Sequence, residues 1–352
     1  MPSRLPPDLL TRSSRESSRI LALSYLDEIS LAEQRLGDRD NTDALHDFRV
    51  GLRRFRSALS AYREPLEDSV TGKMRRQIRR LARATSAGRD TEVQLAWLRH
   101  RATLLAPEDG PGYYWLLGTL EERKEQAYAR DLADVTRSFA DRSEKFRRAL
   151  GTLRIELTNG RTHNAPTFGE TTGGLIRLQV ARVQEELGRV QNAADIEQVH
   201  GTRIALKRLR YLIEPVARHN RRARALVRRF KEAQDLLGEH HDLHVLLAYV
   251  ASLRSGLSAD DRGTVEPGLI TLRHHAEEGA ATAFQRFQEM WGGDLGFRIL
   301  TRASEVGSEL VNGPGIGHRD RMTVTTGSEQ AVPENQQAVT SANGQQPTAN
   351  SQ

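Results

Sequence analysis

The sequence contains no cysteine, so the chain can form neither a disulfide bond nor a metal site built from thiolates. It also lacks any apolar run close to the roughly 20 residues that a membrane-spanning helix requires, and its N-terminus has no signal-peptide core. From these absences we expect a soluble, intracellular protein located in the cytoplasm.

The familiar catalytic signatures are missing as well. There is no Walker loop, no His-Glu-x-x-His and no Gly-x-Ser-x-Gly. The glycines of residues 313–317 resemble a phosphate loop only superficially, because no strand precedes them and no Lys-Ser/Thr follows. His240, His241 and Asp242 suggest a metal site, but the first half of the chain has no matching ligands. We therefore predict no catalytic residue, no metal and no cofactor.

What the sequence does have is positive charge gathered in clusters. Lys and Arg number 52 against 46 Asp and Glu, which gives a formal net charge of +6 and a pI near 9.8. Residues 73–89 hold seven Lys or Arg and no acid, and residues 203–231 hold eleven with only Glu214 opposing them. Such clustering needs a counter-anion or full solvation, and it favours an anionic partner.

One basic segment occurs twice. Residues 45–56 return as residues 199–210 at a constant offset of 154, which indicates internal duplication. On a helix, the histidine and three of the cations of the first copy share an arc of roughly 80° beside an apolar arc. A single copy would fit a merely solvated basic face, but two matching copies favour a binding surface. The matched pairs are His46 and His200, Arg49 and Arg203, Arg53 and Lys207, Arg54 and Arg208, and Arg56 and Arg210.

A second pair of helices matches at an offset of 152. It aligns Arg76 with Arg228 and Arg79 with Lys231. Asp90 and Asp242 also align. They could orient arginines of a neighbouring helix, or they could be carboxylates at helix N-termini, where the helix dipole favours them.

The apolar spacing predicts an all-α fold with no strand. The domain organisation that we predict is a flexible N-terminus at 1–12, a first repeat at about 13–157, a linker at 158–174, a second repeat at about 175–310, and a disordered tail at 311–352. Helices are expected at 13–35, 42–63, 71–88, 90–105, 114–139, 143–157, 171–190, 194–220, 221–237, 260–291 and 295–310.

The repeated His-x-x-Arg-x-x-x-(Arg/Lys)-Arg-x-Arg pattern resembles the CHAD domain, the conserved-histidine α-helical domain. Arg89-Asp90 in one half, and Leu236-Leu237-Gly238 with Asp242-Leu243 in the other, strengthen the resemblance, which covers about residues 15–310. It implies two pseudo-symmetric antiparallel helical bundles around a basic central surface or pore, and binding of inorganic polyphosphate. The binding positions that it implies are His46, Arg49, Arg53, Arg54, Arg56, His200, Arg203, Lys207, Arg208 and Arg210, to which the second helix pair adds Arg76, Arg79, Arg228 and Lys231.

We therefore predict a non-catalytic polyphosphate-binding protein, with association with polyphosphate granules as a further expectation. Two alternatives stay open. A nucleic-acid-binding protein fits the high pI, although aromatic residues make up only 5% of the chain and do not alternate with the basic rows. An enzyme acting on phosphate polymers lacks visible catalytic groups. The sequence leaves open the oligomeric state and whether the histidines contact ligand or core.

Overall fold

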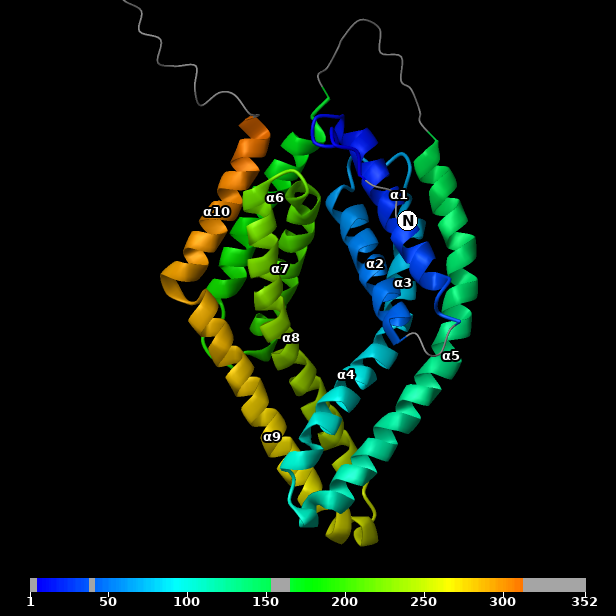
Figure 1. The fold of residues 1–352 in the computed structure, drawn as a ribbon, viewed down its shortest axis with the longest axis vertical. Coiled ribbons are helices and arrows are strands. Elements are labelled where there is room, and N and C mark those ends of the chain that lie inside the picture. Colours follow the sequence, from blue (N-terminus) through cyan, green and yellow to red (C-terminus); the bar gives the residue numbers. More distant parts are fainter. Residues whose placement is uncertain (1–4, 38–41, 153–164, 313–352) are drawn as a thin grey trace, which may run out of the picture. The chain divides into compact units, whose positions relative to one another are not determined.

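The described part of the chain is all-helical. A computed structural model describes residues 5–37, 42–152 and 165–312, and over these ranges it contains ten α-helices and two short 3-10 helices (Figure 1). Within the same ranges the only extended pairing is an isolated bridge between Ser13 and Thr167. The prediction of an all-α fold is confirmed.

The helices follow one another with short connections. They are α1 (Ser14–Glu33), α2 (Thr42–Ala61), α3 (Gly72–Ala84), α4 (Ser86–Arg101), η1 (Ala102–Leu104), η2 (Pro107–Asp109), α5 (Gly110–Gly151), α6 (Phe168–Gly188), α7 (Ile196–Ala217), α8 (Arg221–Ser255), α9 (Ala259–Trp291) and α10 (Gly293–Asn312).

Three predicted helix boundaries are wrong. Residues 114–139 and 143–157 were expected to form two helices, but α5 runs unbroken to Gly151 because residues 140–142 include neither glycine nor proline. The helix expected to end at residue 237 continues as α8 to Ser255. Gly88 was expected to end a helix but lies inside α4. The preceding helix, α3, ends just before Thr85, where ψ is 0°.

The C-terminal part of the predicted linker, residues 168–174, is helical. Thr167 caps α6 by accepting a hydrogen bond from the Glu170 backbone, and the Glu170 carboxylate accepts one from the Thr167 backbone in return. Residues 168–174 therefore belong to α6 rather than to a linker. Residues 153–164 and the predicted tail from residue 313 lie outside the described residues.

The predicted flexible N-terminus, where the structure describes it, contributes to the core. Leu9 is fully buried, and its carbonyl accepts a hydrogen bond from the Ser17 hydroxyl at 2.7 Å. The backbone of Leu10 and Arg12 pairs with Gly169 and Phe168, respectively. These contacts join the start of the chain to the start of α6. Residues 1–4 lie outside the described residues.

The buried apolar side chains form two clusters. The larger one includes residues of both motif helices, α2 and α7, and of the helices around them. The smaller one joins α4, α5, α8 and α9 in the lower part of Figure 1, through side chains such as Leu98, Leu116, Leu246 and Leu269. Each half of the chain thus contributes to both clusters.

The motif helix α2 is fixed by α1 on one side and α5 on the other. A Cβ atom at Gly51 would lie 2.7 Å from Ile29 Cγ1, so glycine is needed where α1 crosses. On the other side, Phe48 packs edge-to-face on Phe139 and Phe55 on Phe146, with centroid distances of 5.3 and 5.0 Å. The apolar arc predicted from the sequence is the buried one, and it determines where the neighbouring cations lie.

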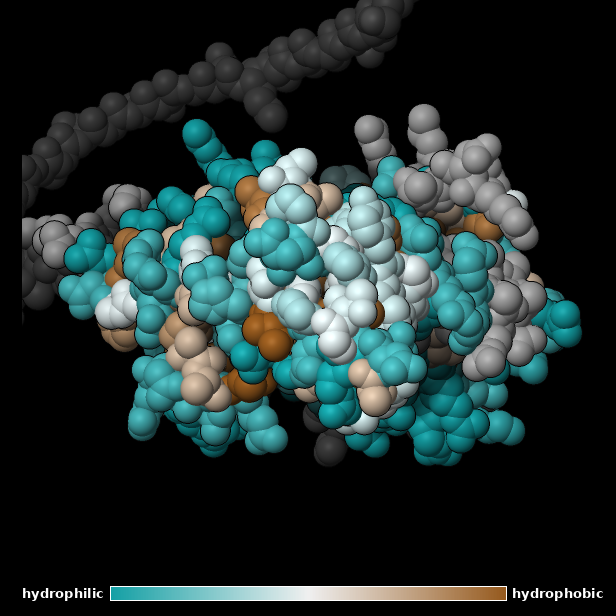
Figure 2. All heavy atoms as spheres, turned by 90° about the horizontal axis from the view of Figure 1, so that it is seen from below, coloured by the Kyte–Doolittle hydropathy of each residue, from teal (hydrophilic) through white to brown (hydrophobic). Residues whose placement is uncertain are grey.

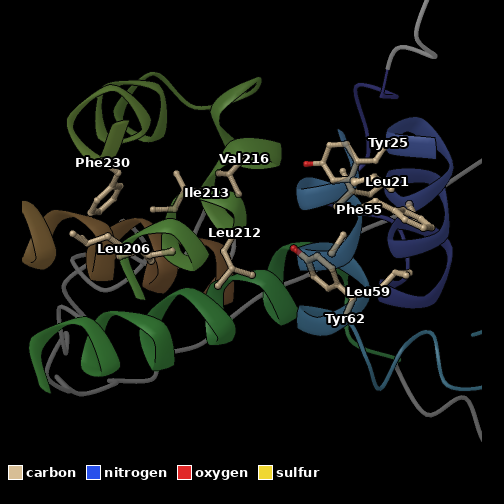
Figure 3. Close-up of a cluster of buried hydrophobic side chains, with 14 of the residues drawn as sticks. Leu21, Tyr25, Phe55, Leu59, Tyr62, Leu206, Leu212, Ile213, Val216 and Phe230 are labelled. Carbon is tan, nitrogen blue, oxygen red and sulfur yellow. The ribbon is translucent and has the colours of Figure 1, made fainter. Parts of the chain in front are cut away.

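The second motif helix, α7, packs between α6 and α8, where Leu206 and Ile213 are fully buried. Figure 3 shows its side chains Leu212 and Val216 facing Tyr25 and Tyr62 of the first half. A hydrogen bond also links the two halves of the chain, since the Tyr62 hydroxyl lies 3.0 Å from the hydroxyl of Thr172 on α6. The two motif helices are therefore near neighbours.

On the face seen in Figure 2, hydrophilic residues predominate and apolar residues form only small separate patches. In the described part of the chain, no helix combines the length and apolarity needed to cross a membrane. Because charge is spread so widely over the surface, exposed cations alone do not mark a binding site.

Candidate anion-binding site

A cavity of about 800 Å³ lies between the two motif helices, with α1, α3 and α6 completing its walls. None of the described residues that line it is an Asp or a Glu. Apolar side chains such as Leu175 and Leu212, the rings of Tyr25 and Tyr62, and a few polar residues complete the lining. Figure 3 shows Leu212, Tyr25 and Tyr62. The basic residues that line the cavity are Arg53, Arg54, Arg56, Arg63, Arg75, Arg79, His200, Lys207 and Arg208.

The cavity brings together half of the predicted binding residues. The predicted residues that line it are Arg53, Arg54 and Arg56 of α2, Arg79 of α3, and His200, Lys207 and Arg208 of α7. These side chains come from segments far apart in the sequence, so the fold converts two separate basic segments into one concentrated positive field.

The other predicted residues lie outside the lining. His46, Arg76 and Arg228 are exposed. Lys231 is exposed too, and its ammonium forms an ion pair at 2.6 Å with Asp235 one turn along α8. Exposed side chains are well solvated, and an exposed ion pair contributes little to the free energy of folding. These four positions are therefore weaker candidates for an enclosed binding site. The remaining predicted residues outside the lining are Arg49, Arg203 and Arg210.

Two lining arginines were not predicted. Arg63 follows the end of α2, and Arg75 lies on α3, where its guanidinium donates a hydrogen bond to the Arg63 carbonyl at 3.4 Å. Neither residue belongs to the repeated motif, so matching the two copies could not identify them. Arg75 does belong to the acid-free basic run of residues 73–89, and that run is the signal that could have found it.

Arg54 has a structural partner that the motif did not suggest. Its guanidinium lies 3.1 Å from Glu214 on α7 and 3.4 Å from Glu28 on α1, so it bridges the two halves. Burial lowers the pKa of Arg54, but these two carboxylates outweigh it and raise the pKa above the ordinary value. Glu214 also lies 3.4 Å from Arg210. Both arginines are therefore partly neutralised.

Arg203 is drawn toward two aspartates. Burial lowers its pKa, while Asp242 of α8 and Asp90 of α4 act to raise it. Asp242 lies in the interior of α8, so the interpretation of it as a helix N-terminal carboxylate is wrong; Asp90 does lie near the start of α4. Both aspartates are within electrostatic reach of one motif arginine, as expected for residues that orient it.

Lys207 is both buried and surrounded by positive charge. Burial, followed by the positive charges of nearby arginines, lowers its pKa to about 7. Burial and then Arg53 likewise lower the pKa of Arg56. An anion bound in the cavity would relieve this repulsion. The arginines that act on Lys207 are Arg203, Arg53, Arg56 and Arg210.

The histidines fall into different environments. His200 is half-buried at the cavity, and burial, followed by the charges of Arg203 and Lys207, lowers its pKa. Its ring lies 4.5 Å from that of His241, whose pKa is lowered to about 4, chiefly by burial. His240 is buried, with Nε2 3.2 Å from the Ala193 carbonyl, which makes it a core histidine.

Several donors at the cavity remain available. Among the described residues, no hydrogen-bond partner faces the buried Nε of Arg53, Nη1 of Arg75, Nδ1 of His200 or the hydroxyl of Tyr211. Buried polar groups in proteins normally have a partner, and leaving one without costs roughly 1–3 kcal/mol. The residues that carry these atoms line the cavity, and phosphate oxygens are acceptors whose charge and geometry suit guanidinium and hydroxyl donors.

Comparison with known families assigns most of the described chain to one of them. A family model described as the CHAD domain matches residues 21–251, a range that includes both motif helices. The chain belongs to the CHAD domain family. The match also covers α3 and most of α8, so every basic residue of the cavity lies in the CHAD domain.

Two solved structures share the fold. The CHAD domain from the plant Ricinus communis is 21% identical, with a TM-score of 0.58, over 83% of this chain and 92% of that one. PptA from Streptomyces chartreusis is 17% identical, also with a TM-score of 0.58, over 82% of this chain and 100% of that one. No curated protein matches the sequence. At these identities the likeness supports the fold alone.

Proposed function

We propose that this CHAD domain binds inorganic polyphosphate in the cavity between α2 and α7, without catalysing its breakdown. The observation that carries the proposal is the concentration of basic residues around about 800 Å³, with no carboxylate among the described lining residues. Polyphosphate is a flexible polyanion with densely spaced charges and no base to read, so it is bound by rows of cations.

The chemistry of the lining supports this ligand class. Arginine predominates, and its guanidinium stays charged when buried and donates through a planar fork that fits phosphate oxygens. Both motif helices contribute, which fits a receptor that arose by duplication and holds its ligand at a basic central surface. We further propose that the protein acts in the cytoplasm and associates with polyphosphate granules.

A titration with polyphosphate of defined lengths tests the binding proposal. We expect saturable binding that is stronger than binding of single-stranded DNA carrying the same number of charges. Because cations must release counterions from the polyanion, the logarithm of the affinity should fall linearly with the logarithm of salt concentration. An affinity that does not change with salt, or a preference for DNA, would overturn the proposal.

Catalysis needs its own measurement. Phosphate release from long polyphosphate should stay at background, with and without added Mg²⁺ or Mn²⁺. Sustained turnover in either condition would contradict a purely binding role.

A further inference from the structure

One lysine of this chain is placed unlike the others. The sequence contains five lysines, namely Lys73, Lys124, Lys145, Lys207 and Lys231, and only Lys207 is among the described residues that line the cavity. Lys73, Lys145 and Lys231 are exposed. Among the described residues, no carboxylate forms an ion pair with Lys207. The chain thus offers one enclosed amine and several surface amines for comparison.

The surroundings of Lys207 favour its uncharged form. Burial and four nearby arginines lower its pKa to about 7, so a large share of this side chain is a free amine at neutral pH. An ordinary lysine, with a pKa near 10.4, is only about 0.1% free amine at pH 7.5. The free amine is the nucleophile, and lysines in cationic surroundings are activated in this way.

The same cavity provides a place for a phosphate group next to the amine. Arg53 and Arg56 on α2 are close enough to Lys207 to act on its charge, and all three side chains line the cavity. The buried Nε of Arg53 and Nδ1 of His200 have no hydrogen-bond partner among the described residues. A small molecule held there by its phosphate would present the rest of its structure to the lysine.

We propose that Lys207 is a covalent modification site that is acylated by small acyl phosphates, the class to which acetyl phosphate belongs. The free Nζ attacks the carbonyl carbon, and an amide bond forms while the bond between that carbon and the phosphate oxygen breaks. The phosphate leaves with the electron pair of the broken bond and takes up the proton that the amine loses. No oxidant or reductant is required.

Acylation would alter the site in a defined way. It removes the one titrating amine of the cavity, together with the positive charge that this amine acquires when an anion is bound. If the cavity binds polyphosphate as proposed above, acylation of Lys207 lowers the affinity for it. The modification chemistry itself requires only that the cavity binds a phosphate group.

Peptide mass spectrometry on the full chain measures the reaction directly. After incubation with acetyl phosphate at pH 7.5, we expect Lys207 to be acetylated at least about tenfold faster than Lys73 and Lys145, because its free-amine fraction is far larger. Excess inorganic phosphate should protect Lys207 and leave the surface lysines unchanged. Equal rates at the three lysines, or the absence of protection, would overturn the proposal.

An acetyl donor without a phosphate group separates the reactivity of the amine from the binding of phosphate. The acetyl ester 4-nitrophenyl acetate has no phosphate, so Arg53→Gln should slow acetylation of Lys207 by acetyl phosphate at least about threefold more than acetylation by the ester. Equal slowing would show that phosphate binding does not guide the reaction and would overturn the proposal. Circular dichroism confirms that the variant is folded.

Polyphosphate binding is measured on the same unmodified protein. If the protein binds polyphosphate but Lys207 is not selectively acetylated, this inference alone is wrong. If Lys207 is selectively acetylated and protected by phosphate but polyphosphate does not bind, only the proposed function is wrong.

Discussion

The two motif helices, α2 and α7, carry the same basic pattern in different surroundings. His200 lines the cavity, whereas its counterpart His46 is exposed outside it. Arg54 pairs with Glu28 and Glu214, whereas its counterpart Arg208 is an exposed lining residue. The difference teaches that a repeated spacing fixes which helix face is basic, while neighbouring helices decide which of its cations remain available to a ligand.

Two matched pairs, Arg53 with Lys207 and Arg54 with Arg208, line the cavity from both motif helices, and the first of them has no carboxylate partner among the ion pairs of the described residues. Arg53 and Lys207 line the cavity from opposite motif copies and act on each other electrostatically. They differ in how they respond to that proximity, since arginine keeps its charge while the amine of lysine loses its proton more readily. This pair is therefore the best place to test whether the two copies act together.

The largest expected effect comes from neutralising this pair. Arg53→Gln/Lys207→Gln should weaken polyphosphate binding about 100-fold, because each lost charge-assisted contact is worth about 1.5 kcal/mol or somewhat more. Isothermal titration calorimetry at constant salt measures the change. The exposed pair Arg76→Gln/Arg228→Gln removes two full positive charges outside the cavity and should cost less than about threefold. An equal loss in both variants would mean that net charge, and not the cavity, determines binding.

A second prediction tests why Arg54 and Arg208 differ. Glu214→Gln removes a carboxylate shared by Arg54 and Arg210, and we expect the free energy of unfolding to fall by about 2 kcal/mol, measured by urea denaturation. Polyphosphate should bind more tightly, because two arginines lose their competing partner. Glu144→Gln is the matched control, since its ion pair with Arg148 is about 70% exposed and should contribute under about 0.5 kcal/mol. A stability change no larger than that of the control would show that Glu214 does not hold the halves together.

The third prediction uses the contrast between arginine and lysine. The pKa of Lys207 is about 7 in the free protein, and a bound polyanion raises it, so the complex holds more protons than the free protein above pH 7. The affinity should therefore fall as pH rises from 7, by at most about tenfold per unit. His200 and His241 also have lowered pKa values, so they stay neutral in this range unless the ligand charges them.

Lys207→Arg is the control for this pH dependence. Arginine stays charged up to at least pH 10, so the affinity of the variant should change less than about twofold between pH 7 and 9. The slope is obtained from titrations in buffers that differ in ionisation enthalpy, which also count the protons taken up. A variant with the wild-type slope would assign the proton to another group.

Much of this arrangement could be predicted from the sequence because it depends on periodicity. The apolar arc containing Phe48 and Phe55 is buried as expected, and it places Arg53 and Arg56 beside the core. The repeated spacing likewise singles out His200 and Lys207, and both line the cavity. The local sequence pattern is sufficient to predict a side chain's position wherever the helix geometry alone determines which way that side chain points.

The remainder depends on contacts between helices that no local pattern encodes. Arg54 is drawn to Glu214, which lies 160 residues along the chain. Arg75 lines the cavity because α3 lies beside α2.

The smallest expected effect concerns the two histidines from which the comparison began. His200→Ala removes a donor whose Nδ1 has no hydrogen-bond partner among the described residues, so polyphosphate affinity should fall about fivefold, the value of one net hydrogen bond of about 1 kcal/mol. His46→Ala alters an exposed residue outside the cavity and should change the affinity less than about twofold. Calorimetry on both variants decides the matter. Equal effects would mean that the two copies bind the ligand alike, and that polyphosphate extends beyond the cavity along α2.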